Sequence, residues 1–127
     1  MEDFVTFEIA KKLKEKDFNE PCWNAINSFG CTYRNGWLEY LSEQEGEFIV
    51  QNDLKQGDYL LPTISQVLKW LREEKDLHIV IPACFNKNYW WEIRDFNRNI
   101  SEYSDAEYIS YEEAALSGIE YALVDLI

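Results

Sequence analysis

The side chains best suited to nucleophilic chemistry in this sequence are a single histidine, His78, and three cysteines, Cys22, Cys31 and Cys84. A catalytic triad needs its histidine oriented by an acid and placed beside an activated serine or cysteine. The sequence contains no G-x-S-x-G turn or similar motif that would hold such a nucleophile. Because His78 lies in a stretch that alternates like a β-strand, a structural or exposed histidine is favoured. We therefore expect no catalytic residues and no enzyme, although dispersed acids can still converge in three dimensions.

Metal and cofactor sites are not indicated either. The cysteines and the histidine could supply four zinc ligands, but no two cysteines share the close C-x-x-C spacing typical of structural zinc sites. Neither GxxxxGK nor GxGxxG is present to cradle a phosphate. The acidic pairs Glu73-Glu74 and Glu112-Glu113 are adjacent on predicted helices, so their side chains diverge by about 100° instead of converging on a metal ion. We expect no metal and no cofactor.

Three amphipathic stretches predict the helices of the scaffold. The first begins after Thr6, whose hydroxyl can cap the first turn, and ends at Asp17. The stretches Thr63 to Gln66 and Ser110 to Glu113 fit capping boxes that open the second and third helices. Trp70 lies beside the apolar stripe of the second helix, and we expect it to be buried at the edge of the core. The predicted buried stripes are Ile9, Ala10 and Leu13, then Ile64, Val67, Leu68 and Leu71, then Ala115, Ile119, Ala122, Leu123 and Leu126.

Alternating stretches predict the strands. Leu77 to Pro82 and Tyr89 to Asp95 read as one hairpin. Asn35-Gly36 supplies two residues that tolerate positive φ, which predicts the tight turn of another hairpin. Phe48 to Val50 is expected to be a further short strand, whereas Asn97 to Tyr108 is expected to be a polar, acidic connection.

The order of these elements predicts the fold class. Helix, strands, helix, hairpin and helix favour an α+β two-layer fold, in which a short antiparallel sheet from hairpins carries about three helices on one face. Gly118 lies at the edge of the last helical stripe, where the missing side chain would permit close packing. A length of 127 residues fits a single domain over 1–127. Strand order and register within residues 22–50 stay open.

The charge of the chain limits its partners. The formal net charge is −12, which repels DNA and RNA phosphates and anionic lipid headgroups. We therefore expect no direct nucleic-acid binding and no membrane binding. Arg98 is the last basic residue, and the acids that follow it are Glu102, Asp105, Glu107, Glu112, Glu113, Glu120 and Asp125. A solvated, solubilising surface is the simplest interpretation of this charge, and an acidic mimic of nucleic acid is the alternative.

The cysteines and the first residues indicate the compartment. Three cysteines without a C-x-x-C motif are unlike a disulfide framework. The start, Met1 to Phe4, lacks the basic and apolar parts of a secretory signal, and no apolar run is long enough to span a membrane. We expect a cytoplasmic protein with three reduced thiols, of which Cys84, beside Ala83 and Phe85, is the most buried.

Two stretches carry a family resemblance. Tyr59 to Thr63, Lys69 to Glu73 and His78-Ile79 form the first, and Tyr108 to Ala114 forms the second. Together they resemble a family of small uncharacterised proteins encoded in phages and mobile elements of gut bacteria, over about the second half of the chain. The resemblance implies an intracellular setting and a small α+β fold. It implies no activity and no catalytic residues.

The aromatic residues supply the remaining candidate site. Alternation sends Trp90 to the sheet face opposite Trp91, and Glu92 and Arg94 share the face of Trp90. If helices cover one face, Trp90 with Glu92 and Arg94 forms a binding surface on the open side, since exposed Trp commonly anchors protein association. The alternative is that strands within residues 22–50 cover Trp90. The favoured function is a non-catalytic interaction or accessory module that binds a protein partner or itself; the alternatives are an acidic nucleic-acid mimic and a small enzyme.

Overall fold

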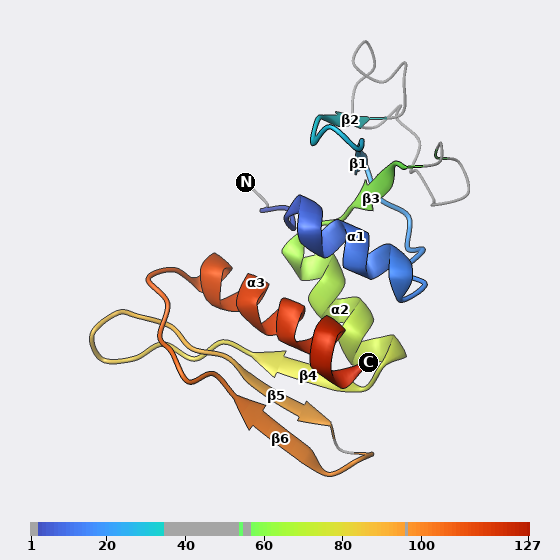
Figure 1. Ribbon diagram of the computed structural model, residues 1–127. Helices are drawn as coiled ribbons and strands as arrows, with labels where there is room; N and C mark the ends of the chain where they lie inside the picture. Colours follow the sequence, from blue (N-terminus) through green and yellow to red (C-terminus); the bar gives the residue numbers. More distant parts are fainter. Residues whose placement is uncertain (1–2, 35–53, 55–56, 96) are drawn as a thin grey trace. The chain divides into compact units, whose positions relative to one another are not determined.

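The computed structural model describes residues 3–34, 54, 57–95 and 97–127 (Figure 1). The described residues divide into two compact units: an N-terminal unit, which lies within 4–63, and a C-terminal unit, which consists of Asp3 and the described residues of 64–127. Each unit contains at least one helix and a three-stranded antiparallel sheet, so the predicted α+β class is confirmed. The strands form two sheets, whereas one short sheet was predicted. The N-terminal unit contains α1 (Phe7–Glu15), β1 (Asn24–Ile26), β2 (Thr32–Arg34) and β3 (Tyr59–Leu61).

The first helix, α1, has the predicted cap at each end. The Thr6 hydroxyl accepts a hydrogen bond from the Ile9 amide at 3.2 Å, which satisfies a free donor of the first turn. At the other end Asp17 has a left-handed backbone with φ of 63°. The Phe18 amide then donates to the Leu13 carbonyl at 3.0 Å, as in a Schellman motif, and the Phe18 ring is buried. The reversal returns the chain to the buried face of α1.

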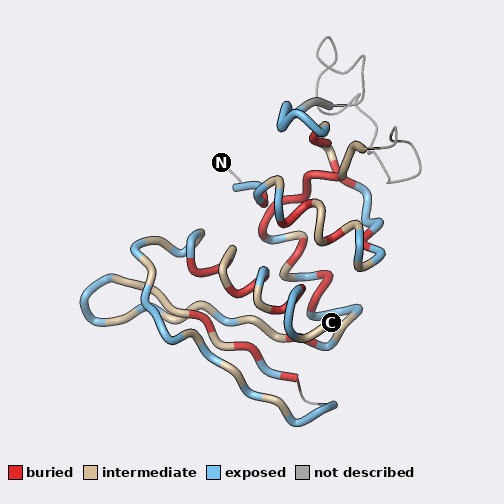
Figure 2. The backbone as a smooth tube through the Cα atoms, viewed as in Figure 1, coloured by how far each residue is buried: buried red, intermediate tan, exposed pale blue. Residues whose placement is uncertain are grey.

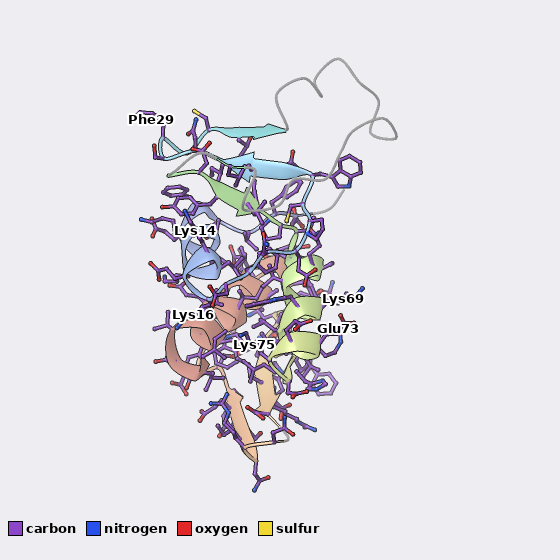
Figure 3. All side chains as sticks on the ribbon, turned by 90° about the vertical axis from the view of Figure 1, so that its right-hand side faces the viewer. Lys14, Lys16, Phe29, Lys69, Glu73 and Lys75 are labelled. Carbon is purple, nitrogen blue, oxygen red and sulfur yellow. The ribbon has the colours of Figure 1, made fainter. Side chains whose placement is uncertain are left out.

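The sheet of the N-terminal unit has the order β2-β1-β3. A turn joins β1 to β2, and the Asn27 side-chain oxygen accepts from the Cys31 amide at 3.0 Å while Gly30 takes a φ of 83°. Phe29 at this turn projects away from the unit (Figure 3). The predicted Asn35-Gly36 turn and Phe48–Val50 strand lie outside the described residues.

The C-terminal unit is a two-layer structure. The helices α2 and α3 lie over one face of the sheet, whose order is β4-β5-β6 (Figure 1). Buried residues follow the sides of these helices and of β5 (Figure 2). The elements are α2 (Ile64–Glu74), β4 (Leu77–Val80), β5 (Glu92–Asp95), β6 (Ile100–Tyr103) and α3 (Tyr111–Tyr121), which continues into a π-helical turn η3 (Ala122–Leu126).

The strand β6 corrects one sequence prediction. Asn97 to Tyr108 was expected to be a polar connection, yet Ile100–Tyr103 pairs antiparallel with β5. A positive φ of 54° at Asn99 completes the turn that leads into this strand. An edge strand exposes one side to solvent and needs few apolar residues, so its alternation is weak in sequence.

The predicted burial of Trp70 on α2 is confirmed. Its side chain is 6% exposed, and Val67 and Leu71 beside it are fully buried. The Lys75 ammonium lies 5.4 Å from the centre of the Trp70 ring. Lys69 is exposed on the outer side of the helix (Figure 3), as expected for a long basic side chain. Trp70 therefore closes the edge of a core, with Lys75 over its ring and Lys69 in solvent.

The helix α3 packs tightly on the sheet through Gly118. The Ser110 hydroxyl caps the helix by accepting from the Glu113 amide at 3.1 Å, as predicted. A Cβ at position 118 would lie 3.1 Å from Trp91 Cγ and 3.3 Å from Ile79 Cγ2, which is closer than ordinary contact. The absence of a side chain therefore permits the close approach of α3 to β4 and to Trp91, as the sequence indicated.

The prediction that Cys84 is the most buried thiol is wrong. Cys22 is completely buried, Cys84 is half-buried and Cys31 is exposed, and all three are free. Cys84 lies in the turn between β4 and β5, where Phe85 and Ala83 point into solvent. Apolar residues next to Cys84 in the sequence do not predict that its side chain is buried, because a hairpin turn projects from the sheet into solvent.

Candidate functional site

Within the C-terminal unit, α2 and α3 lie on one face of the sheet, and no other described element of this unit covers the opposite face. Antiparallel pairing places Glu92 opposite both Val80 and Tyr103, so these side chains lie on the same face. Val80 is 47% exposed and Tyr103 is 66% exposed, whereas Ile93, which points to the other face, is fully buried. We call the outward side chains of this sheet the open face: His78, Val80, Trp90, Glu92, Arg94, Ser101 and Tyr103.

The three residues singled out from the sequence come together on the open face. Trp90 immediately precedes Trp91, which is buried on the opposite side, and Glu92 and Arg94 follow at alternate positions. Trp90 is half-buried because it packs against the outside of the sheet instead of against a helix. The alternative, in which strands within residues 22–50 cover Trp90, lies partly outside the described residues.

An aromatic pair forms the apolar part of the open face. The rings of Trp90 and Tyr103 meet edge to face, with centroids 6.5 Å apart and planes at 88°. Sequence reasoning missed Tyr103 because it assigned this stretch to a connection. The alternation of Ile100 and Glu102 with Ser101 and Tyr103 was the signal that could have revealed it.

One ion pair lies beside the aromatic pair. Arg94 Nε donates to Glu92 Oε1 at 3.0 Å, and the two side chains are 53% and 18% exposed. An exposed pair of this kind contributes little to stability, typically about 0–1 kcal/mol. Its more important effect is on local charge, because one acid and one base cancel. Glu92 and Arg94 therefore add no formal net charge to the open face, on a chain whose formal net charge is −12.

The other side of the sheet holds a hydrogen-bonded network. The Trp91 indole Nε1–H donates to the Ser117 hydroxyl at 3.1 Å, and Ser117 shares a 2.6 Å hydrogen bond with the Tyr108 hydroxyl. The Trp91 and Tyr121 rings lie 5.0 Å apart at 36°. These contacts hold Trp91 in one orientation beneath α3, so the polar end of a buried indole is satisfied.

A shallow groove beside this network gathers negative charge. Its volume is about 270 Å³, and its lining residues are Trp91, Ser117, Glu120, Tyr121, Val124 and Asp125. Burial raises the pKa of the Tyr121 phenol, and the neighbouring carboxylates of Glu102, Asp125 and Asp105 raise this pKa further. Part of the acidic surplus that follows Arg98 is therefore concentrated at one place on the C-terminal unit.

The residues considered for catalysis lie on different elements of the fold. His78 lies on the open face, whereas Cys84 lies in the β4–β5 turn, where burial and Glu107 raise the pKa of its thiol. Burial also raises the pKa of Cys22 to about 12, so this thiol stays protonated and is a poor nucleophile. Among residues 3–34, 54, 57–95 and 97–127, no three His, Cys, Asp or Glu side chains are grouped to hold a metal ion.

In comparisons with known proteins, no family model, no curated protein and no solved structure matches this chain. None of the helices within the described part of the chain is long and apolar enough to cross a membrane. The candidate site therefore rests on the geometry of the open face itself.

Proposed function

We propose that this protein is a non-catalytic, cytoplasmic protein-interaction module that binds through the open face of its β4-β5-β6 sheet. The observation that carries the proposal is the edge-to-face pair of half-buried Trp90 and exposed Tyr103, beside exposed Val80. Aromatic anchors of this kind supply most of the binding energy in many protein interfaces.

The architecture of the C-terminal unit explains why such a face is available. The core of the unit needs only one side of the sheet, and α2 and α3 already cover that side. Two large rings on the other side contribute nothing to that core. Leaving Trp90 and Tyr103 in contact with water costs hydrophobic free energy, which a bound protein would recover.

A phage or mobile-element origin is part of this proposal. It rests on the resemblance carried by Tyr59 to Thr63, Lys69 to Glu73 and Tyr108 to Ala114. An accessory protein of such an element acts inside the bacterial cell, and the three free thiols suit that reducing compartment. The acidic surface keeps the module soluble and away from nucleic acid.

The test uses one substitution on the open face and one matched control. Tyr103→Asp places a charge within the aromatic pair, while Phe85→Asp makes a comparable change at the fully exposed β4–β5 turn. We expect wild-type protein and the Phe85 variant to form the same complex in pull-down and sedimentation experiments, and the Tyr103 variant to lose it. Equal binding by all three proteins would show that another surface is used. A strict monomer without a captured protein would count against an interaction module altogether.

The acidic groove favours a second candidate function, the imitation of nucleic acid toward a basic protein. Glu102, Asp105 and Asp125 all lie close enough to Tyr121 to raise the pKa of its phenol. Carboxylates gathered in this way resemble the charge density that nucleic-acid-binding proteins recognise. Wild-type protein should then capture from a host lysate proteins that also bind immobilised DNA, and the triple variant E102Q/D105N/D125N should no longer capture them. Unchanged capture by the triple variant would exclude this function for the groove.

A further inference from the structure

The charge of the open face restricts which partners can bind there. We propose that the open face binds the same face of a second copy of this chain, giving a weak two-fold symmetric dimer. This inference rests on the proposed interaction function and names its partner. The argument has three steps, which concern charge, apolar contact and area.

Charge restricts where two copies can meet. Each chain carries −12, so most of one chain's surface repels the same surface of another. The open face is an exception, since its one acid, Glu92, and its one permanently charged base, Arg94, cancel. A two-fold axis brings identical patches together, which requires a patch that is complementary to itself. A face with one acid and one base satisfies this requirement, because Glu92 of each copy can approach Arg94 of the other.

Apolar contact supplies the attraction. Trp90, Tyr103 and Val80 form the apolar part of the face, and the last two are substantially exposed. Two sheets that pack face to face interdigitate such side chains across about 10 Å. The aromatic rings of the two copies can therefore bury one another, with Glu92 and Arg94 beside them on the central strand β5.

The area of the open face determines how strongly two copies can associate. Three strands about 4.8 Å apart, each with four residues rising about 3.4 Å, give a face of roughly 200 Å². Stable interfaces bury about 800 Å² per partner, so this contact belongs to the weak class. We expect a weak dimer in rapid exchange with monomer, which is visible in concentrated solution and absent in dilute solution.

Sedimentation equilibrium over a wide concentration range tests the dimer directly. The average mass of wild-type protein should rise with concentration, and Phe85→Asp should behave in the same way because Phe85 is outside the open face. Tyr103→Asp should remain monomeric. Circular dichroism and thermal unfolding confirm that each variant is folded. A wild-type mass that stays monomeric to millimolar concentration overturns the inference.

A charge exchange gives a stricter test of the symmetric pairing. Glu92→Arg leaves two bases on the face, and Arg94→Glu leaves two acids, so each variant alone should repel itself and dimerise at least about tenfold more weakly. An equimolar mixture of the two should associate more strongly than either alone, because each face then meets its opposite. Failure of the mixture to associate, with both variants folded and wild type dimeric, overturns pairing through these residues.

The outcome also separates this inference from the function on which it rests. If wild type remains monomeric but binds a different purified protein, and Tyr103→Asp abolishes that binding, the second copy is the wrong partner and the interaction function stands. If wild type neither dimerises nor binds another protein through this face, both proposals fail.

Discussion

Substitution of Gly118 by alanine tests how tightly α3 packs on the sheet. The new Cβ would lie 3.1 Å from Trp91 Cγ, 3.2 Å from Trp91 Cβ and 3.3 Å from Ile79 Cγ2. Carbon atoms normally pack at about 3.5–4.0 Å, so either the helix or Trp91 must move. Trp91 is poorly able to move, because its indole donates to Ser117 and its ring packs on Tyr121.

Two opposing effects determine the free energy of unfolding of Gly118→Ala. Alanine improves helix propensity by about 1 kcal/mol, while an extra methyl group in a tightly packed core costs about 1–3 kcal/mol. Because the three close contacts involve fixed side chains, we expect packing to dominate and the variant to be about 1 kcal/mol less stable than wild type.

Urea unfolding followed by tryptophan fluorescence measures this difference. Gly118→Val enlarges the same overlap and gains less helix propensity than alanine, so it should lower stability further than alanine. A stability series of glycine, alanine and valine in descending order supports the packing argument. An increase of about 1 kcal/mol in Gly118→Ala would refute it, because propensity alone would then account for the effect.

Further predictions concern the core, a turn, the cysteines and the whole chain. Trp70→Ala should cost about 3–5 kcal/mol in thermal or urea unfolding, whereas Lys69→Ala should have little effect because its side chain is exposed. Lys87 has a φ of 69°, so Lys87→Gly should raise the urea midpoint by the equivalent of about 0.5–1 kcal/mol. Burial raises the folded-state pKa of Cys22 from 9.0 to about 12. Protonated Cys22 therefore stabilises the fold below pH 9, and this stabilisation is lost as the pH rises from 9 toward 12. Cys22→Ala should make the urea midpoint less dependent on pH in that range. A thiol reagent should modify Cys31 first, and three thiols should react after denaturation. The single domain expected from the length predicts one cooperative transition in calorimetry, and two separated transitions would contradict it.

The helices could be predicted because their signals are local. Thr6 and Ser110 were identified as caps from the sequence, and the structure places both hydroxyls on the expected amides. The burial of Trp70 followed from its angle on a helix of known period. Neither inference depended on any residue more than a few positions away.

Strand pairing could not be predicted in the same way. Ile26 pairs with Tyr59 across more than thirty residues, and no local pattern specifies that partner. Only part of the open face could be predicted, because its remaining part depends on strand pairing. Trp90 and Arg94 followed from alternation within one stretch, but Tyr103 joins them only through the register between β5 and β6.

Trp90 and Trp91 are adjacent in the chain but lie on opposite faces of the sheet, so their NMR signals should respond to different changes in the protein. The Trp91 indole proton is held by Ser117 beneath α3, so its NMR signal should disappear from its native position only when the helix separates from the sheet. The Trp90 ring lies on the outside with Tyr103, so its signal should respond to whatever binds the open face while the fold stays intact. A single isotope-labelled sample, with tryptophan alone labelled, would therefore report unfolding and association separately from neighbouring positions in the chain.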